Sequence, residues 1–564
     1  MSELILAVRS GHNASACIGD RSKVLFAIQE ERLNREKNYW GFPALSIHAC
    51  LEAVGASIKD LAAVVCPERW ILSKYHSRED ILNAYRRHGT LVGRLRQRVA
   101  VPLVLTLRPN YGETEFRALL ADQGLGNVPL SIYDHHTAHA ATAYYGLRAN
   151  PNKKYLVFTC DGSGDGLCAT VRVMGGGEEQ MVATTPMSDT LGAVYAWVTY
   201  AMGFLPMEHE YKLMGMAPYA SESATLEAAK MFEAYLGLTP NGLSFQRRIR
   251  EKISDFSDRL FRDMKGRRFD YICAGLQRFT EDLLVNWTAC AVKETGVRDV
   301  LVAGGVFMNV KANKRIAELP EVTSFEAFPS CSDETLTFGG YYLEAAKRFG
   351  DAKVEPLSNF YLGDDIRDED ALQTIKASGL KYHRPEDMAG EVADLLISGQ
   401  PVARCAGPME FGARALGNRS ILADPSNQDV VRVINQMVKK RDFWMPFAPV
   451  VLESRQHEYL VNPKNLRSPY MMMTFDTKEN FRDLIAAVHN ADLTCRAQLL
   501  NELINPELYR ILKSFEQKTS RGVLLNTSFN LHGWPIVRTP QDAIDVLNNS
   551  GLNYLQVGNY LVHK

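Results

Sequence analysis

The sequence predicts an α/β protein whose N-terminal part contains two similar lobes. Two segments carry this prediction, because each reads as an apolar strand, a polar turn and a second strand. Leu4–Val8 leads into the turn at 9–15, and Tyr155–Thr159 leads into the Gly-rich turn at 161–166. Exposed backbone N–H groups in such turns can cradle phosphate. Two such turns, each opening a similar α/β unit, indicate a duplication with a nucleotide in the cleft, as in actin, sugar kinases and chaperone ATPases.

A change of composition predicts a further domain. At 564 residues the chain is too long for a single core. The stretch at 352–360 contains a proline and has the character of a linker. We therefore expect an N-terminal domain over 1–351 and a C-terminal α/β domain over 352–564.

The overall composition excludes several classes of protein. The 64 Lys and Arg residues balance 65 Asp and Glu residues, which argues against a nucleic-acid or membrane-surface partner. No apolar run approaches the ~20 residues of a membrane span, and the acidic N-terminus is unlike a signal peptide. The ten cysteines include no Cys-x-x-Cys pair. We expect reduced thiols and a cytoplasmic protein.

The remaining elements of the N-terminal part follow from local patterns. Apolar runs predict strands at Val128–Tyr133 and Val300–Ala303. Interleaved acidic and basic residues at 247–268 indicate a solvated surface excursion. Helical patterns run through Leu191–Met202, Ala224–Tyr235 and Leu276–Thr295.

Two histidines predict a metal site at the start of a helix. His135 and His139 are four residues apart and follow a predicted strand, so they share one helix face. Asp161 and Asp333 end other strands and could complete the site, and this donor set suits iron, manganese or zinc. The alternative is a helix with solvated or capped histidines, with the two aspartates serving as turn or capping residues.

Small and acidic residues nearby are candidates for binding ATP or an adenylate. Gly162, Ser163 and Gly164 could hold phosphates through backbone N–H groups. Glu210 could bind ribose hydroxyls, and Lys212 is a further nucleotide-binding candidate, although the two could equally form a surface pair of little energetic value. The set is completed by residues that follow a predicted strand, Gly304, Gly305 and Asn309.

The C-terminal domain carries a second, cationic group. Its Arg and Lys side chains lie near apolar or glycine-bounded segments, where an unpaired charge would be costly. Several such cations imply an anion with several oxygens, such as a phosphate. The alternative is a set of structural ion pairs with Glu410, Asp424 and Asp442. The candidates are Arg414, Arg419, Lys439, Arg441 and Arg496, with Asn526 and Ser528 as further donors.

Several motifs resemble those of the NodU/CmcH-type O-carbamoyltransferases, which include the nodulation, cephamycin and tobramycin carbamoyltransferases. Gly-His-Asn-Ala-Ser at 11–15 and His-His-Thr-Ala-His-Ala at 135–140 are similar to family motifs. So are Tyr-Lys-Leu-Met-Gly-Met-Ala-Pro-Tyr at 211–219 and Leu-Asn-Thr-Ser-Phe-Asn at 525–530. The most specific match is the long segment at 409–423, which contains Arg414. The resemblance covers nearly the whole chain.

The resemblance implies a fold and an activity. The N-terminal part would be a duplicated actin-like (ASKHA) domain similar to TsaD, and the C-terminal part would be similar to YrdC. The YrdC-like site would form carbamoyl-adenylate from carbamoyl phosphate and ATP, with Mg²⁺ accompanying the ATP. The TsaD-like site would hold Fe²⁺ or another divalent metal and pass the carbamoyl group to a hydroxyl of a small molecule. Natural product or antibiotic biosynthesis is the implied setting, and a homodimer is compatible with the sequence.

The family's functional residues carry over by motif. His135, His139, Asp161 and Asp333 match the metal ligands, and His12 matches a histidine near the acceptor hydroxyl, to which we assign the role of general base. The match to carbamoyl-phosphate positions covers Arg414, Lys439, Arg496 and Ser528, to which we add Arg441 and Asn526. Arg414 and Lys439 are also assigned catalytic roles.

The sequence departs from the family at several positions. Asn13 replaces an Asp, Pro408 an Arg, and Ala413 a Pro. Asn490 stands where the family has a His, and His489 lies one place away. These changes concern the details of the carbamoyl-phosphate pocket.

Three other readings compete with the carbamoyltransferase. An actin-like small-molecule kinase would use Asp161 as base but leaves the C-terminal cations unexplained. A tRNA-modifying protein would need a basic face, and a non-enzymatic nucleotide-gated protein would not consume carbamoyl phosphate. The acceptor is not specified, although an aromatic group could line its pocket: Tyr39, Trp40, Phe42, Trp70 and Tyr75.

Overall fold

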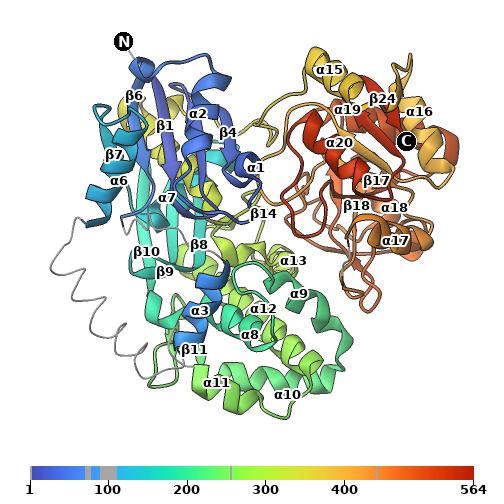
Figure 1. Ribbon diagram of the computed structural model, residues 1–564. Helices are drawn as coiled ribbons and strands as arrows, with labels where there is room; N and C mark the ends of the chain where they lie inside the picture. Colours follow the sequence, from blue (N-terminus) through green and yellow to red (C-terminus); the bar gives the residue numbers. More distant parts are fainter. Residues whose placement is uncertain (1–2, 70–77, 89–110, 254–256, 440–441) are drawn as a thin grey trace. The chain divides into compact units, whose positions relative to one another are not determined.

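The protein is described here from a computed structural model, which covers residues 3–69, 78–88, 111–253, 257–439 and 442–564. The chain divides into two compact units (Figure 1). The first contains Met1–Glu30 and Asn38–Leu357, and the second contains Glu31–Lys37 and Ser358–Lys564. The chain thus crosses between the units after Leu357, whereas the linker analysis placed the boundary after residue 351.

The first lobe of unit 1 is a five-stranded sheet in the order β4-β3-β1-β6-β7. β1 is antiparallel to β3, which is antiparallel to β4, while β6 and β7 continue in parallel with β1. The strands are rich in fully buried apolar residues because helices cover the sheet. Their bounds are β1 Leu4–Arg9, β3 Ser15–Gly19, β4 Val24–Gln29, β6 Leu61–Cys66 and β7 Leu130–Ile132.

The second lobe repeats this topology in the order β10-β9-β8-β13-β14. Again the first three strands are antiparallel and the last two are parallel to the central one. This repeat confirms the predicted duplicated, actin-like α/β class. The bounds are β8 Tyr155–Gly164, β9 Leu167–Gly175, β10 Glu178–Pro186, β13 Asp299–Ala303 and β14 Ser324–Ala327.

Two helices join the lobes at their centre. α7 (His135–Leu147) packs on β8, β9 and β13, and α14 (Leu336–Phe349) packs on β1, β3 and β6. The two helices also pack on each other. A Cβ at Gly339 would lie 1.9 Å from the Ala138 carbonyl oxygen, so this close approach requires glycine.

The other helices of unit 1 lie mostly beside the second lobe (Figure 1). The three helices predicted from periodicity are confirmed as α8, α10 and α12. The charged excursion at 247–268 contains an amphipathic helix, α11, with Leu260 and Met264 buried. The bounds are α2 Ala44–Ala53, α3 Arg78–His88, α6 Tyr111–Asp122, α8 Leu191–Ala201, α9 Glu210–Met216, α10 Glu222–Glu233, α11 Ser257–Met264, α12 Phe269–Thr295 and α13 Val310–Glu318.

Unit 2 is a mixed α/β domain around one eight-stranded sheet, in the order β15-β24-β23-β16-β17-β22-β18-β21. The strands are β15 Lys381–His383, β16 Val402–Cys405, β17 Arg419–Ala423, β18 Ala448–Leu452, β21 Gln498–Leu500, β22 Val523–Ser528, β23 Tyr554–Val557 and β24 Tyr560–His563. The helices are α15 Asp368–Ser378, α16 Met388–Ile397, α17 Asp429–Ile434, α18 Gln456–Tyr459, α19 Pro506–Thr519 and α20 Pro540–Asn548. Apolar clusters fill both sides of the sheet.

A short N-terminal segment completes unit 2. Residues 31–37, which include α1 (Glu31–Asn34), belong to this unit although they lie between β4 and β5 in the sequence. Arg32 Nη2 donates to the Gly412 carbonyl at 2.6 Å, and Arg35 Nη1 donates to the Ile536 carbonyl at 2.9 Å. Local sequence patterns do not predict that residues 31–37 belong to unit 2, because this depends on contacts between residues about 380 and 500 positions apart.

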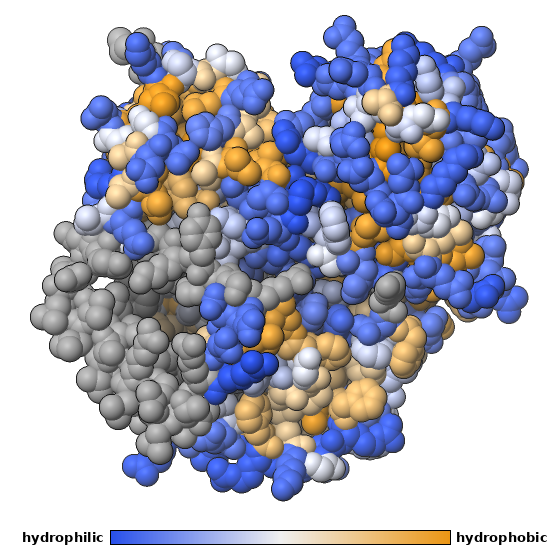
Figure 2. Space-filling model, viewed as in Figure 1, coloured by the Kyte–Doolittle hydropathy of each residue, from blue (hydrophilic) through white to orange (hydrophobic). Residues whose placement is uncertain are grey.

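The surface and the helices give no sign of a membrane span. Hydrophilic residues predominate on the face shown in Figure 2, with smaller apolar areas between them. Among the helices of the described residues, none is both long and apolar enough to cross a bilayer.

Candidate active site

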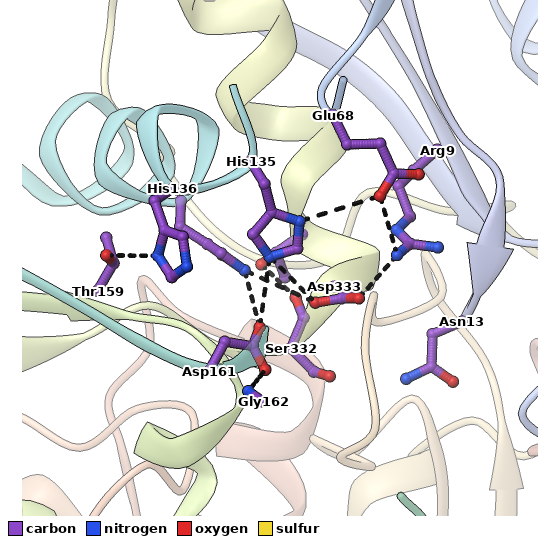
Figure 3. Close-up of polar contacts among 12 residues, drawn as sticks. Arg9, Asn13, Glu68, His135, His136, Thr159, Asp161, Gly162, Ser332 and Asp333 are labelled. Atoms are coloured by element: carbon purple, nitrogen blue, oxygen red, sulfur yellow. Dashed lines mark hydrogen bonds and ion pairs between the residues drawn. The ribbon is translucent and has the colours of Figure 1, made fainter. Parts of the chain in front are cut away.

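The predicted histidine helix forms and begins at a well-defined cap. The Asp134 side chain accepts a hydrogen bond from the Thr137 N–H at 3.0 Å, which fixes the start of α7. His135 and His139 share one face and are buried. His136 points elsewhere, and its Nδ1 lies 2.8 Å from Thr159 Oγ1 (Figure 3). Thus His136 serves the core, and the solvated-histidine alternative does not describe this helix.

His135 and His139 meet two aspartates from the second lobe and the start of α14. His139 Nε2 lies 3.1 Å from Asp161 Oδ2 and 3.6 Å from Asp333 Oδ1. His135 Nε2 lies 3.6 and 3.9 Å from the same two oxygens (Figure 3). A four-coordinate ion with bonds of about 2.1 Å separates its ligand atoms by about 3.4 Å. The spacing of the four side chains therefore suits one metal ion.

The far oxygen of each carboxylate is held by another group. Asp161 Oδ1 accepts from the Gly162 N–H at 2.6 Å, and Asp333 Oδ2 accepts from Arg9 Nη2 at 2.7 Å. Each carboxylate consequently offers one oxygen to the cluster. Within the described residues, the buried Nε2 of His135 makes no hydrogen bond although it faces both carboxylates. A ring nitrogen placed in this way fits a metal ligand.

The electrostatics of the cluster favour a cation. Burial alone would lower the pKa of His135, but the carboxylates of Asp161, Glu68 and Asp333 outweigh it and raise the pKa to about 10. Burial would raise the pKa of Asp161, but the two histidines hold it well below its usual range. The pocket thus stabilises positive charge strongly.

His12 occupies a short ladder in the first lobe. It pairs with Trp40, where β2 (Gly11–His12) meets β5 (Trp40–Gly41), and the two rings are 5.3 Å apart. Burial lowers the pKa of His12, and the charge of Asp333 offsets this only partly. A neutral imidazole at pH 7 can accept a proton, as a general base must.

The residues around His12 differ in their surroundings. Asn13 has a φ of 56°, a conformation that Asn tolerates well, and its Nδ2 lies 3.4 Å from Glu334 Oε2. Phe42 is buried against Phe116 and belongs to the core. Of the proposed acceptor aromatics, Trp70 and Tyr75 lie outside the described residues.

The glycines predicted to bind nucleotide pack tightly around the metal-type cluster, which consists of His135, His139, Asp161 and Asp333. A Cβ at Gly164 would lie 2.2 Å from the His135 ring, and one at Gly305 would lie 3.2 Å from Asp161 Oδ1. Gly304 has a φ of 103°, and its Cβ would lie 2.3 Å from the Cys160 carbonyl oxygen. Ser163 is exposed beside them. These contacts place the Gly-rich turns directly beside the histidines.

The other nucleotide candidates have local partners. Glu210 accepts from the Met207 N–H at 2.6 Å, and burial raises the pKa of Glu210 to about 7. The Lys212 ammonium lies 4.9 Å from the centre of the Phe204 ring. Asn309 caps α13 by accepting from the Ala312 N–H at 3.1 Å. A nucleotide-binding role for these residues stays a prediction.

In unit 2, Lys439 and Ser528 meet. Lys439 ends the π-helical turn Asn435–Lys439 and is buried. Its Nζ lies 3.0 Å from Ser528 Oγ and 2.6 Å from Asn530 Oδ1, and it also donates to the Asn530 carbonyl at 3.2 Å. Three neutral oxygens thereby orient one ammonium group. Arg441 lies outside the described residues.

Asn526 ties together the segments that carry Arg414 and Arg496. Its Nδ2 donates to the Ala415 carbonyl at 3.0 Å and lies 3.3 Å from Gln498 Oε1. Ala415 follows Arg414 directly, and Gln498 is two residues after Arg496. Both arginine-bearing segments thus meet at Asn526 on β22, and Ser528 lies two residues further along the same strand.

Two of the acidic residues named in the structural ion-pair alternative, Asp424 and Glu410, have other partners than Arg414, Lys439 or Arg496 in the contacts described. Asp424 pairs with Arg521 at 2.6 Å, and Glu410 Oε1 accepts from the Leu416 and Arg419 N–H groups. Arg419 is fully buried and donates to backbone carbonyls, including that of Gly407 at 2.9 Å. Arg419 therefore holds the loop that carries Arg414.

The loop at 489–494, where Asn490 replaces the family's histidine, forms a hydrogen-bonded turn. The His489 N–H donates to the Thr494 carbonyl at 2.8 Å, and His489 Nδ1 accepts from the Ala491 N–H at 3.2 Å. Leu493 has a φ of 54°, a left-handed conformation that favours glycine. His489 is thus engaged within its own loop.

Sequence reasoning missed four polar residues of these sites. Arg9 and Glu68 flank the metal-type cluster, while Gln498 and Asn530 support Asn526 and Lys439. Asn530 is the last residue of the family-like motif at 525–530, so membership of that motif was a signal that it belongs to the site. Arg9 directly follows the buried strand Leu4–Val8, which was the available signal for a buried charge at a strand end.

The fold and the two sites define an α/β enzyme with a metal-type centre in a duplicated domain and a cationic group in a second domain. Family profiles described as Carbamoyltransferase N-terminus and Carbamoyltransferase C-terminus match residues 5–339 and 393–564. The chain belongs to the carbamoyltransferase family and is a carbamoyltransferase of the nodulation protein U type.

Relatives span the whole chain. Nodulation protein NolNO of Sinorhizobium fredii is 30% identical over 98% of this chain and 79% of its own length. An uncharacterised protein of Methanocaldococcus jannaschii is 30% identical over 100% of both chains. A solved structure of full-length HypF, in its phosphate- and nucleotide-bound form, is similar with 14% identity and a TM-score of 0.30, over 62% of this chain and 56% of that one.

Proposed function

We propose that the protein is an ATP-dependent O-carbamoyltransferase that forms carbamoyl-adenylate and passes its carbamoyl group to a hydroxyl of a small molecule, a natural product. The observation that carries the proposal is the cluster of His135, His139, Asp161 and Asp333, a cation site beside Gly-rich turns. Membership of the carbamoyltransferase family supplies the reaction class. Iron(II) is the proposed metal, and antibiotic biosynthesis is one setting of this chemistry.

The first half-reaction belongs to unit 2. Water releases phosphate from carbamoyl phosphate, and a carbamate oxygen then attacks the α-phosphorus of ATP while the bond to pyrophosphate breaks. The Lys439 ammonium and the Arg414 and Arg496 guanidinium groups bind the phosphate oxygens. Ser528 and Asn526 add hydrogen-bond donors. Mg²⁺ accompanies the ATP.

The second half-reaction belongs to unit 1. The acceptor hydroxyl oxygen attacks the carbamoyl carbon, the bond from that carbon to the AMP oxygen breaks, and His12 takes the hydroxyl proton. The backbone N–H groups at 162–164 hold the adenylate phosphate. His135, His139, Asp161 and Asp333 would hold a divalent metal, which would supply a Lewis acid for the reacting carbonyl.

Pyrophosphate release tests this proposal. Purified protein is incubated with ATP and iron(II) under anaerobic conditions, with and without carbamoyl phosphate. Release that depends on carbamoyl phosphate is expected. Formation of ADP with an added alcohol, without pyrophosphate, would instead support the actin-like kinase and overturn the adenylate route.

A further inference from the structure

Two buried, oppositely charged side chains stand behind the metal-type cluster. Arg9 is the last residue of β1, and Glu68 lies two residues after the end of the neighbouring parallel strand β6. Their side chains are only 6% and 7% exposed. Arg9 Nη2 lies 3.4 Å from Glu68 Oε2, so the two charges form a buried pair (Figure 3). A buried ion pair often contributes little net stability, because desolvation offsets the attraction between the charges. A role in the neighbouring cluster would explain its position better than a role in stability.

The Arg9 guanidinium is committed to protein groups. Nη2 donates to Asp333 Oδ2 at 2.7 Å as well as approaching Glu68, and Nη1 donates to the Ser10 carbonyl. Because both Nη1 and Nη2 of Arg9 donate hydrogen bonds to protein groups, Arg9 orients Asp333 rather than binding substrate. Asp333 Oδ1 is consequently turned toward His139 Nε2, 3.6 Å away.

Glu68 acts on the other side of His135. Its Oε2 lies 3.9 Å from His135 Nδ1, while His135 Nε2 faces Asp161 and Asp333. A negative charge beside Nδ1 favours the proton on that nitrogen. Nε2 is then the nitrogen that faces the cluster, where a metal ion would take the place of its proton.

The formal charges of the group match a divalent cation. Asp161, Asp333 and Glu68 carry three negative charges, and Arg9 carries one positive charge. With His135 and His139 neutral, as imidazole ligands of a metal must be, the net formal charge is −2. Removing Arg9 would make the group more negative, and neutralising Glu68 would make it less so.

We propose that Arg9 and Glu68 are positioning residues of the metal centre: Arg9 orients Asp333 through a hydrogen bond, and the charge of Glu68 favours the orientation of His135 in which Nε2 is directed at a divalent cation. This inference rests on the metal site in the proposed function. Outer groups that orient metal ligands in this way commonly change affinity by about 10–100-fold.

The test measures binding of iron(II), and of cobalt(II) as a coloured probe, by anaerobic equilibrium dialysis of the full chain. Arg9→Gln and Glu68→Gln are each expected to weaken binding by about 10–100-fold. Arg9→Lys should recover part of the loss, since an ammonium can still reach one carboxylate. The cobalt(II) spectrum of the variants should change in shape, which reports altered ligand geometry.

The Arg9→Gln variant separates positioning from simple charge. On charge alone, removing a cation next to a cation site would tighten metal binding. Orientation of Asp333 predicts weaker binding instead. Tighter or unchanged binding by Arg9→Gln, with an unchanged cobalt(II) spectrum, would overturn the inference.

A matched control separates positioning from general loss of stability. Arg148 is also buried in unit 1, pairs with Asp351 at 3.0 Å and donates to the Val354 carbonyl. Arg148→Lys should lower the thermal midpoint as Arg9→Lys does, but leave metal affinity unchanged. If the wild-type chain binds no metal, the proposed metal site fails. If the wild type binds metal and Arg9→Gln and Glu68→Gln bind it equally well, this inference alone fails.

Discussion

The two candidate sites of the molecule are built from opposite chemistry. The site in unit 1 gathers carboxylates and imidazoles from β8, the turn before α14 and the start of α7, and it stabilises a cation. The site in unit 2 gathers the Lys439 ammonium, a hydroxyl and amides around β22, on segments that also carry Arg414 and Arg496. The difference supports the proposal that the two units handle different steps, one with a metal and one with an anionic substrate.

The largest effect is expected from a substitution that disrupts the site in unit 1. Asp161→Asn removes a charge that faces both histidines, so metal binding should fall at least about 100-fold and carbamoyl transfer about 1,000-fold. Metal analysis and a transfer assay check both values. Asp299→Asn is the control, because Asp299, the first residue of β13 in the same sheet, pairs with the half-exposed Lys153. Full metal content in Asp161→Asn would contradict the assignment.

The next effect breaks the unit 2 site. Lys439→Ala removes the ammonium that contacts Ser528 and Asn530, and turnover of carbamoyl phosphate should fall by about 100-fold. Metal content should stay at the wild-type level. Lys518→Ala, which removes an exposed ion pair with Asp394 in the same unit, is the control. Equal turnover in Lys439→Ala and Lys518→Ala would remove Lys439 from the site.

A smaller effect concerns pH and the nucleotide. Burial raises the pKa of Glu210 to about 7, so its carboxyl is mostly neutral at pH 6 and mostly ionised at pH 8. If the carboxylate accepts from ribose hydroxyls, the affinity of unit 1 for AMP should rise about tenfold from pH 6 to pH 8. Titration calorimetry of the wild type and Glu210→Gln measures this. The variant should show a flat profile, and a persistent slope would assign the dependence to another group.

The same pKa has a consequence for stability, with a defined sign. The folded state holds a proton on Glu210 more tightly than the unfolded state, so this stabilisation is complete below the usual pKa of glutamate and disappears as pH rises through about 7. Glu210→Gln should therefore flatten the fall in thermal midpoint between pH 5 and 8.

The smallest effect sharpens the description of unit 2. Leu493 is 43% exposed and has a φ of 54°, which disfavours a side chain with a Cβ. Leu493→Gly should raise the free energy of unfolding by about 0.5–1 kcal/mol, because glycine relieves the strain and little packing is lost. Denaturant unfolding measures this, and a clear loss of stability would show that Leu493 contributes packing that outweighs its strain.

Local patterns in the sequence predicted the repeated lobes and the histidine helix. The strands around 4–8 and 155–159 are short apolar runs, and the i, i+4 spacing of His135 and His139 is a property of one helix. Asp161 and Asp333 do meet the histidines, but not as strand ends: Asp161 lies within β8, and Asp333 lies in the turn Asp333–Thr335 that precedes α14.

Contacts between residues far apart in the chain could not be predicted from local sequence patterns. Nothing local distinguishes Arg32 and Arg35 from surface arginines, yet they bind backbone carbonyls of unit 2. Asp424 was considered as a partner for the substrate-site cations, but it pairs with Arg521, 97 residues away. Such pairings depend on which strands become neighbours, and periodicity carries no information about that order.

The most direct test of the two-site account is pyrophosphate release by His139→Ala. The account predicts that this variant lacks metal and transfers no carbamoyl group, but releases pyrophosphate from ATP in the presence of carbamoyl phosphate at a rate within about threefold of wild type. Loss of pyrophosphate release together with transfer, in a variant that unfolds at the wild-type temperature, would contradict the division of the reaction between the two units.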